Sequence, residues 1–329
     1  MRVKRLLLVI LLAASGWAGW WVWGSQSLRA AHEDWFAERR ADGWVAEYDT
    51  LSVQGFPNRF DVRLTGLSLA DPATGLAWEA PVFQLMRLSY RPRHLIAVWP
   101  EEFLLATPRG KLGVSGQDLR ASLILRPDEP LALERANLAA ETLNLTPAEG
   151  GAWAVAQLSA AVQREATAEA TYRFAFTAEG VAPPAPLARG LPETLEALRA
   201  DLKVGFDRSW NMAAIEGTRP QPRKVEITTA ELRWGRLELA AAGRLEVDAE
   251  GWPEGRLDLR AQNWREILRL GRDGGMLPPG LADTLEEGLS LLARLSGNRE
   301  TLDLPLSFRD RVVSLGPIPI GPAPRLVIR

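Results

Sequence analysis

The chain has 329 residues, of which 47% are hydrophobic and 24% charged, so it carries enough apolar side chains for one large β structure or about two domains. Its 39 basic and 41 acidic residues give a net charge of −2, which excludes the cationic character typical of nucleic-acid-binding proteins. Cysteine is absent and the two histidines are His32 and His94. This composition excludes disulfides and thiol catalysis, and it predicts neither a metal site nor a cofactor.

Residues 1–27 are predicted to form a transmembrane anchor. An uncharged run of 21 residues extends from Leu6 to Gln26, and about 20 apolar residues suffice for a helix to cross a bilayer. Basic residues at positions 2, 4 and 5 precede the run, which favours a cytoplasmic N-terminus. We therefore expect a single-pass protein of the inner membrane with a periplasmic body. Four tryptophans are expected at the far membrane interface: Trp17, Trp20, Trp21 and Trp23.

Two alternatives to an uncleaved anchor stay open. A cleaved signal peptide would end in small residues, and positions 13–16 (Ala-Ala-Ser-Gly) offer these, although the apolar run continues through Trp17. A buried helix of a soluble protein is the second alternative. Without its three N-terminal basic residues the chain has 36 basic and 41 acidic residues, a net charge of −5. Contact with lipid would therefore depend on apolar surface rather than on charge.

The segment after the anchor, residues 28–43, is predicted to be a helical stalk. Leu28, Ala31, Trp35 and Phe36 fall on one side of this charged segment. His32 lies in the same segment beside acidic residues, which favours a solvated position rather than a ligand role.

The remaining chain is interpreted as two β halves, residues 44–180 and 192–329, joined by a proline-rich linker over residues 181–191. Helices are expected near residues 192–203 and over residues 264–295, where leucines recur at helical spacing. The proline-rich C-terminal tail is expected at an edge, because proline cannot donate a hydrogen bond to a central strand.

Apolar residues in both halves alternate with polar ones, which predicts a mainly β fold of long, curved antiparallel meander strands with one dry face. The longest run, from Arg236 to Asp248, contains Gly243, where a strand could bend or bulge. The dry face is either the core of a closed sandwich or the lining of an open trough. The candidate lining residues are Phe60, Val62, Leu64, Leu237, Leu239, Leu245, Leu257, Leu259, Leu304 and Leu306.

Motifs for catalysis are absent from the sequence. It contains no phosphate-binding glycine loop, no nucleophile elbow and no zinc-protease motif, so we expect no enzymatic activity and name no catalytic residue. His94 precedes an apolar run, which favours a structural role at the start of a strand.

The segment Val53–Phe60 (Val-Gln-Gly-Phe-Pro-Asn-Arg-Phe), with an N-terminal anchor upstream, resembles the envelope family known as domain of unknown function 2125. The segments Leu232–Gly235, Gly243–Gly255 and Leu304–Pro319 carry further similarity, so the resemblance covers most of the chain. It implies no established activity. Within the first segment, Gly55, Phe56 and Pro57 are expected to form a turn, because glycine and proline favour one.

The strand pair Gly243–Asp248 and Gly255–Leu259 is also similar to strand pairs of AsmA-like envelope proteins. That weaker resemblance implies a hydrophobic trough used in lipid transport. We therefore expect a protein that binds or shuttles lipid acyl chains along an apolar sheet groove in envelope maintenance. The alternative is a non-catalytic scaffold that docks another envelope protein through a sheet edge.

Overall fold

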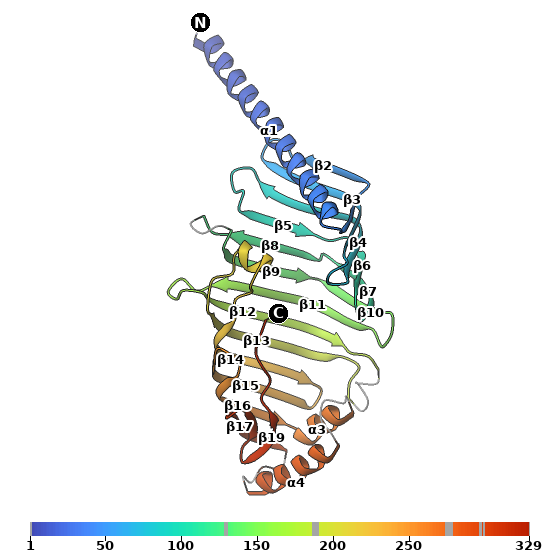
Figure 1. Cartoon of the computed structure of the whole chain (residues 1–329), viewed down its shortest axis with the longest axis vertical. Helices are drawn as coiled ribbons and strands as arrows, with labels where there is room; N and C mark the ends of the chain where they lie inside the picture. The colour runs from blue at the N-terminus through green and yellow to red at the C-terminus, as the bar shows by residue number, and fades with distance from the viewer. Residues whose placement is uncertain are drawn as a thin grey trace. The chain divides into compact units, whose positions relative to one another are not determined.

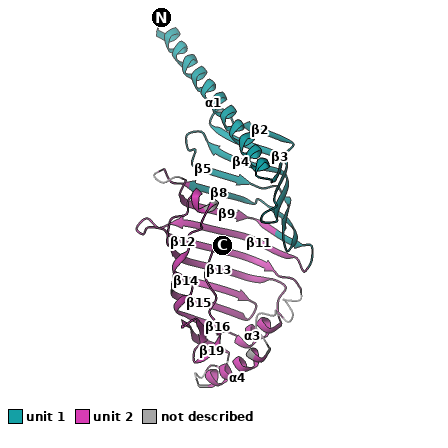
Figure 2. Ribbon diagram, in the orientation of Figure 1, with its two compact units in different colours: residues 1–124, 144–149 teal, residues 125–143, 150–329 magenta. Residues whose placement is uncertain are grey.

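A computed structural model of the chain describes residues 2–127, 131–185, 191–273, 279–295, 298 and 300–328. These residues form nineteen strands and four helices, so the prediction of a mainly β fold is confirmed (Figure 1). Contacts between residues divide the chain into two compact units (Figure 2). Unit 1 is Met1–Ile124 with Asn144–Glu149, and unit 2 is Leu125–Leu143 with Gly150–Arg329.

Unit 1 combines one long helix with an antiparallel sheet. The helix, α1, extends without interruption over Arg2–Ala41, so the predicted anchor and stalk are one continuous helix. The strands that lie wholly or mostly in unit 1 are β1 (Val45–Glu47), β2 (Thr50–Gln54), β3 (Arg59–Asp71), β4 (Leu76–Leu88), β5 (His94–Val98), β6 (Glu102–Thr107), β7 (Gly110–Gln117), β8 (Arg120–Leu125) and β10 (Thr142–Pro147).

The centre of the unit 1 sheet is the pair β3–β4. Its register places Arg59 opposite Leu88 at one end and Asp71 opposite Leu76 at the other, so the two strands are matched over their full length. Strands β1 and β2 both pair with β3 on its other side. Helix α1 contacts β1 and β2, and its Phe36 is buried in the unit 1 core with Leu51 and Leu67.

Unit 2 is a meander in which consecutive strands pair antiparallel in one layer. Strand β9 pairs with β11, and from β11 to β19 each strand pairs with the next. The described strands of this unit therefore form a single curved sheet rather than two packed sheets (Figure 1). They are β9 (Leu133–Ala140), β11 (Trp153–Arg164), β12 (Thr171–Ala182), β13 (Leu195–Phe206), β14 (Pro222–Trp234), β15 (Leu237–Val247), β16 (Pro253–Gln262), β17 (Thr301–Arg309), β18 (Val312–Leu315) and β19 (Ile318–Pro322).

Three helices accompany the unit 2 sheet: α2 (Met212–Glu216), α3 (Trp264–Asp273) and α4 (Pro279–Leu295). The expected helical region over residues 264–295 is thus confirmed for the residues that the structure describes. The buried residues Trp264, Leu285 and Leu289 form one core cluster with Leu302 of β17, so α3 and α4 pack on the sheet at β17.

The prediction of a helix near residues 192–203 was wrong, because these residues contribute most of strand β13. Its leucines at positions 195, 198 and 202 have helical spacing. In the structure the segment pairs with β12 from Leu195 and with β14 from Ala197, and the pairing with β14 shifts register between Asp201 and Leu202. Pairing on both sides overrides the local spacing. The unit boundaries also fall elsewhere than the predicted linker 181–191, in which residues 186–190 lie outside the described residues.

Gly243 lies at an irregularity of β15, as the sequence indicates. Its φ of +148° is a conformation that other residues rarely adopt, and an added Cβ would lie 2.4 Å from the carbonyl oxygen of Arg256. The pairing of β14 with β15 shifts register between Ile227 and Ala230, beside this glycine. The close approach of β16 therefore requires glycine at this position.

Candidate functional site

The C-terminal half of α1 packs on the unit 1 sheet. Phe36 is 2% exposed, and its ring makes an edge contact with the ring of Tyr48 at 4.7 Å between centroids. Leu64 and Leu67 of β3 belong to the same buried cluster. This half of the helix is therefore part of the folded unit rather than a solvated stalk.

An apolar cavity of about 390 Å³ lies between α1 and the strands β3 and β4. Helix α1 contributes Ala31, His32, Trp35 and Phe36 to its wall. The two strands contribute Leu64, Leu67, Leu69, Trp78, Phe83 and Leu85. The volume falls within the range of about 300–1,000 Å³ that is usual for small-molecule sites.

The cavity wall offers little polar chemistry. The ring nitrogen Nδ1 of His32 donates to the carbonyl oxygen of Leu28, one turn earlier in α1, at 2.8 Å. The indole nitrogen of Trp78 is buried and has no hydrogen-bond partner among the residues that the structure describes. Its ring packs against Phe83 at 4.9 Å, and Phe83 in turn contacts Trp99 at 5.4 Å between centroids. Such a surface suits an apolar guest, because burial of hydrocarbon needs no hydrogen-bond partner.

Earlier on the helix, the tryptophans of α1 contact the turn between β2 and β3. The indole N–H of Trp17 donates to the carbonyl oxygen of Pro57 at 2.9 Å, and that of Trp21 donates to the carbonyl oxygen of Arg59 at 2.8 Å. The Trp21 ring also stacks on Phe60, with centroids 5.7 Å apart. Gly24 permits this approach, since an added Cβ would lie 2.8 Å from the tip of the Phe60 ring.

Gly55, Phe56 and Pro57 lie in that turn. Gly55 has a φ of +101°, and an added Cβ would lie 2.9 Å from the Cβ of Arg59, so the tight turn favours glycine. The backbone N–H of Arg59 closes the turn on the carbonyl oxygen of Gly55 at 2.8 Å. The Phe56 side chain is 57% exposed, although one edge of its ring meets Trp21.

Three charged residues, Arg59, Asp61 and Arg87, lie around Phe60 at this end of the sheet. Asp61 pairs with Arg59 at 2.8 Å, and partial burial raises the pKa of Asp61 while Arg59 opposes that shift. The guanidinium of Arg87 lies 5.6 Å from the centre of the Phe60 ring, and burial lowers the pKa of Arg87. Phe60 is therefore enclosed by α1 and by Arg87 rather than open to a ligand.

The sequence profile of a bacterial family, described as an uncharacterized protein conserved in bacteria (DUF2125), matches residues 21–324. The chain belongs to the DUF2125 family. No curated protein and no solved structure matches the chain. The matched region of this DUF2125 protein includes Trp21, the β2–β3 turn and every residue of the cavity wall.

Helix α1 is the one element among the described residues of this DUF2125 chain that is long and apolar enough to cross a membrane. The mean hydropathy of its most apolar window is 1.8, and none of that window is buried in the protein. The helix is therefore a candidate membrane anchor, which agrees with the expectation for residues 1–27.

The ten predicted lining residues are divided between the units, and the register of β15, β16 and β17 places the seven in unit 2 on one face of its sheet. Leu64 is the member of the set that reaches the cavity, while Phe60 and Val62 are 5% and 3% exposed within unit 1. The other seven lie in unit 2. Leu237 packs in a cluster with Trp234. Leu245, Leu257 and Leu306 pack in a second cluster with Phe308. Leu304 packs against the cluster formed with α4, and Leu239 and Leu259 are half-buried.

Sequence reasoning missed most of the cavity wall. The helical spacing predicts that Trp35 and Phe36 share one side of a helix, but no local pattern predicts which strands they face. Phe83 and Leu85 are separated by the polar Gln84 in β4, which is a weak signal because Val82 and Met86 on either side are apolar.

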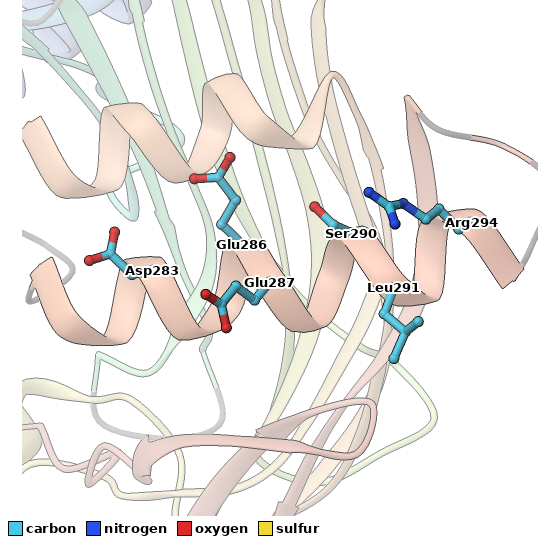
Figure 3. Close-up of a pocket in the computed structure, with 6 residues that line it drawn as sticks. All are labelled: Asp283, Glu286, Glu287, Ser290, Leu291 and Arg294. Carbon is cyan, nitrogen blue, oxygen red and sulfur yellow. The ribbon is translucent and has the colours of Figure 1, made fainter.

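A second hollow lies on the surface of α4, and its described lining residues all belong to that helix (Figure 3). Asp283 and Glu286 extend toward the neighbouring helix, whereas Glu287 and Leu291 extend away from it. Within the part of the chain that the structure describes, no three His, Asp or Glu residues are grouped as metal ligands would be. This hollow therefore offers a polar surface without a convergent set of groups.

Proposed function

We propose that the protein is a membrane-anchored, non-enzymatic protein of the inner membrane that binds or shuttles lipid acyl chains in envelope maintenance, with its body in the periplasm. The observation that carries the proposal is the apolar cavity between α1 and the β3–β4 pair. The helix that forms one wall of the cavity is the same helix that is long and apolar enough to enter a membrane.

The position of the cavity on α1 supports an exchange of lipid with the bilayer. Ala31 in the cavity wall follows Trp21 by ten residues, about 15 Å along a helix. A lipid acyl chain that leaves the bilayer beside α1 would therefore travel a short path to reach the cavity. Covering roughly 200 Å² of acyl chain would contribute about 5 kcal/mol at 25 cal/mol per Å².

The scaffold alternative is less favoured at the β19 edge. Strand β19 pairs with β18 and carries Pro319 and Pro322. These prolines have no backbone N–H, so β19 could offer a partner strand fewer hydrogen-bond donors. Proline on an edge strand is one way in which natural proteins avoid unwanted strand pairing. The other sheet edges leave this alternative open to experiment.

The proposal is tested by extracting lipid from the purified full chain. We expect a defined, stoichiometric phospholipid or fatty acid in the organic extract after mild detergent exchange, measured by mass spectrometry. A Leu85→Trp variant fills the cavity and is expected to lose most of that lipid. A matched Leu76→Trp variant changes an exposed leucine of the same strand outside the cavity and is expected to retain it. Equal lipid content in the three proteins would contradict the proposal.

A further inference from the structure

The length of α1 that is free of the sheet is too short to cross a bilayer alone. Every residue from Arg2 to Trp17 is exposed, and Trp17 makes the first hydrogen bond from the helix to the sheet. The apolar residues before that contact, Leu6–Gly16, span only about 17 Å at 1.5 Å per residue. A hydrocarbon core is about 30 Å thick, so nearly half of it would have to be crossed by residues after Gly16.

Those later residues are the ones that hold the β2–β3 turn. Trp17 and Trp21 donate to the carbonyl oxygens of Pro57 and Arg59, so this turn must lie at the depth of Trp17–Trp21 on the helix. When α1 spans a membrane with these bonds intact, the turn reaches the bilayer. We propose that the β2–β3 turn and the adjoining β4–β5 turn form a second membrane contact, which enters the outer part of the bilayer beside α1.

The exposed side chains of the two turns suit the bilayer interface. Phe56 is 57% exposed and Tyr90 is 63% exposed, and the backbone N–H of Ser89 donates to the carbonyl oxygen of Asn58 at 2.9 Å. This bond ties the two turns together at one end of the β3–β4 pair. Aromatic rings with an apolar body are enriched at the level of lipid headgroups.

Positive charge at this end of the β3–β4 pair is compatible with contact with lipid headgroups. Arg91 and Arg93 in the β4–β5 turn are exposed, and each guanidinium can donate to a headgroup phosphate. The other end of the β3–β4 pair carries the polar turn Asp71–Gly75, where Asp71 accepts from the hydroxyl of Thr74 at 2.7 Å. The contrast between the two ends of the same strands distinguishes the proposed contact from scattered exposed residues, which are normal on any protein.

The absence of cysteine permits a direct test on the full chain. Single cysteines at Asn58 and Tyr90, each labelled with an environment-sensitive fluorophore, report on the two turns after reconstitution into phosphatidylcholine–phosphatidylglycerol vesicles. Ala73→Cys in the Asp71–Gly75 turn is the matched control, because it lies on the same strand pair at the opposite end. Quenching by nitroxide groups attached to the lipids measures proximity to the bilayer.

We expect labels at positions 58 and 90 to be quenched several-fold more strongly than the label at position 73, with blue-shifted emission. The Asn58→Cys variant keeps both Phe56 and Tyr90, so at least one probe leaves the aromatic contacts intact. Equal, water-like emission at all three positions in protein that retains α1 in the bilayer would overturn the proposal. The result does not depend on whether lipid enters the cavity, so the two proposals can fail separately.

Discussion

The indole nitrogen of Trp21 donates a hydrogen bond to the carbonyl oxygen of Arg59, 38 residues later in the chain, at 2.8 Å. Arg59 is the first residue of β3, and Phe60 beside it stacks on the same indole ring. The candidate membrane helix and the central strand of unit 1 are thus joined by a directional bond and an aromatic contact. This joint fixes how far the helix can leave the sheet.

Replacing Trp21 with alanine should loosen this joint. The variant loses the bond to Arg59 and the stack on Phe60, so we expect unit 1 to lose about 1–3 kcal/mol of unfolding free energy. Hydrogen exchange in detergent or nanodiscs should show faster exchange in residues 55–60. Trp23→Ala is the control, because Trp23 is 67% exposed and should change stability by less than about 0.5 kcal/mol. Similar effects of both substitutions would show that the joint is not stabilising.

Gly243→Ala should destabilise unit 2. The φ of +148° and the contact of an added Cβ with the carbonyl oxygen of Arg256 require β15 or β16 to move, at a cost of about 1–3 kcal/mol. Gly205→Ala in β13 is the control, because its added Cβ meets neighbours at 3.5 Å or more and its φ is ordinary. Denaturant midpoints of the two variants measure the difference, and equal midpoints would contradict the steric explanation.

The ion pair between Arg173 and Asp201 on neighbouring strands predicts a pH-dependent contribution to stability. Arg173 Nε donates to Asp201 Oδ1 at 2.9 Å, and the hydrogen bond to Arg173 holds the pKa of Asp201 below its usual value. A depressed pKa means that the pair stabilises the fold above the unfolded pKa of about 3.9. That contribution is lost as the pH falls through the lower pKa of the folded state.

Asp201→Asn should therefore lower the melting temperature slightly at pH 7. The decrease is small because Arg173 is 54% exposed and solvent screens the pair. At a pH below the folded pKa of Asp201, wild type and variant should melt at the same temperature. A difference that is as large in acid as at neutral pH would assign the effect to packing rather than to the ion pair.

The strand rhythm and the apolar N-terminal helix were readable from the sequence, because each depends on side chains that are close together along the chain. Strand β13 shows where that reasoning fails. Leu195, Leu198 and Leu202 match a helical face, yet Leu198 and Leu202 share one strand face with Ala200 and Val204, which pair in unbroken register with β12. Cross-strand pairing with β12 and β14, which no local pattern encodes, decides the outcome.

The cavity was harder to predict than the fold. Trp35 lies more than 30 residues before Leu69 and more than 40 before Trp78, so the wall exists only after α1 packs on the sheet. The sequence predicts that the tryptophans at positions 17 and 21 lie at the membrane interface. Their bonds to the β2–β3 turn add a protein contact that composition alone could not indicate.

Photocrosslinking with a phospholipid that carries a diazirine on its acyl chain tests most directly whether lipid enters the cavity. The full chain in nanodiscs is irradiated, digested and analysed by mass spectrometry. We expect adducts on cavity-wall peptides containing Trp35, Leu69 and Leu85, in addition to adducts on the exposed part of α1, and the Leu85→Trp variant should reduce the former alone. Adducts confined to residues 2–26 and the β2–β3 turn would show lipid around the anchor but none in the cavity, and would contradict the proposed function.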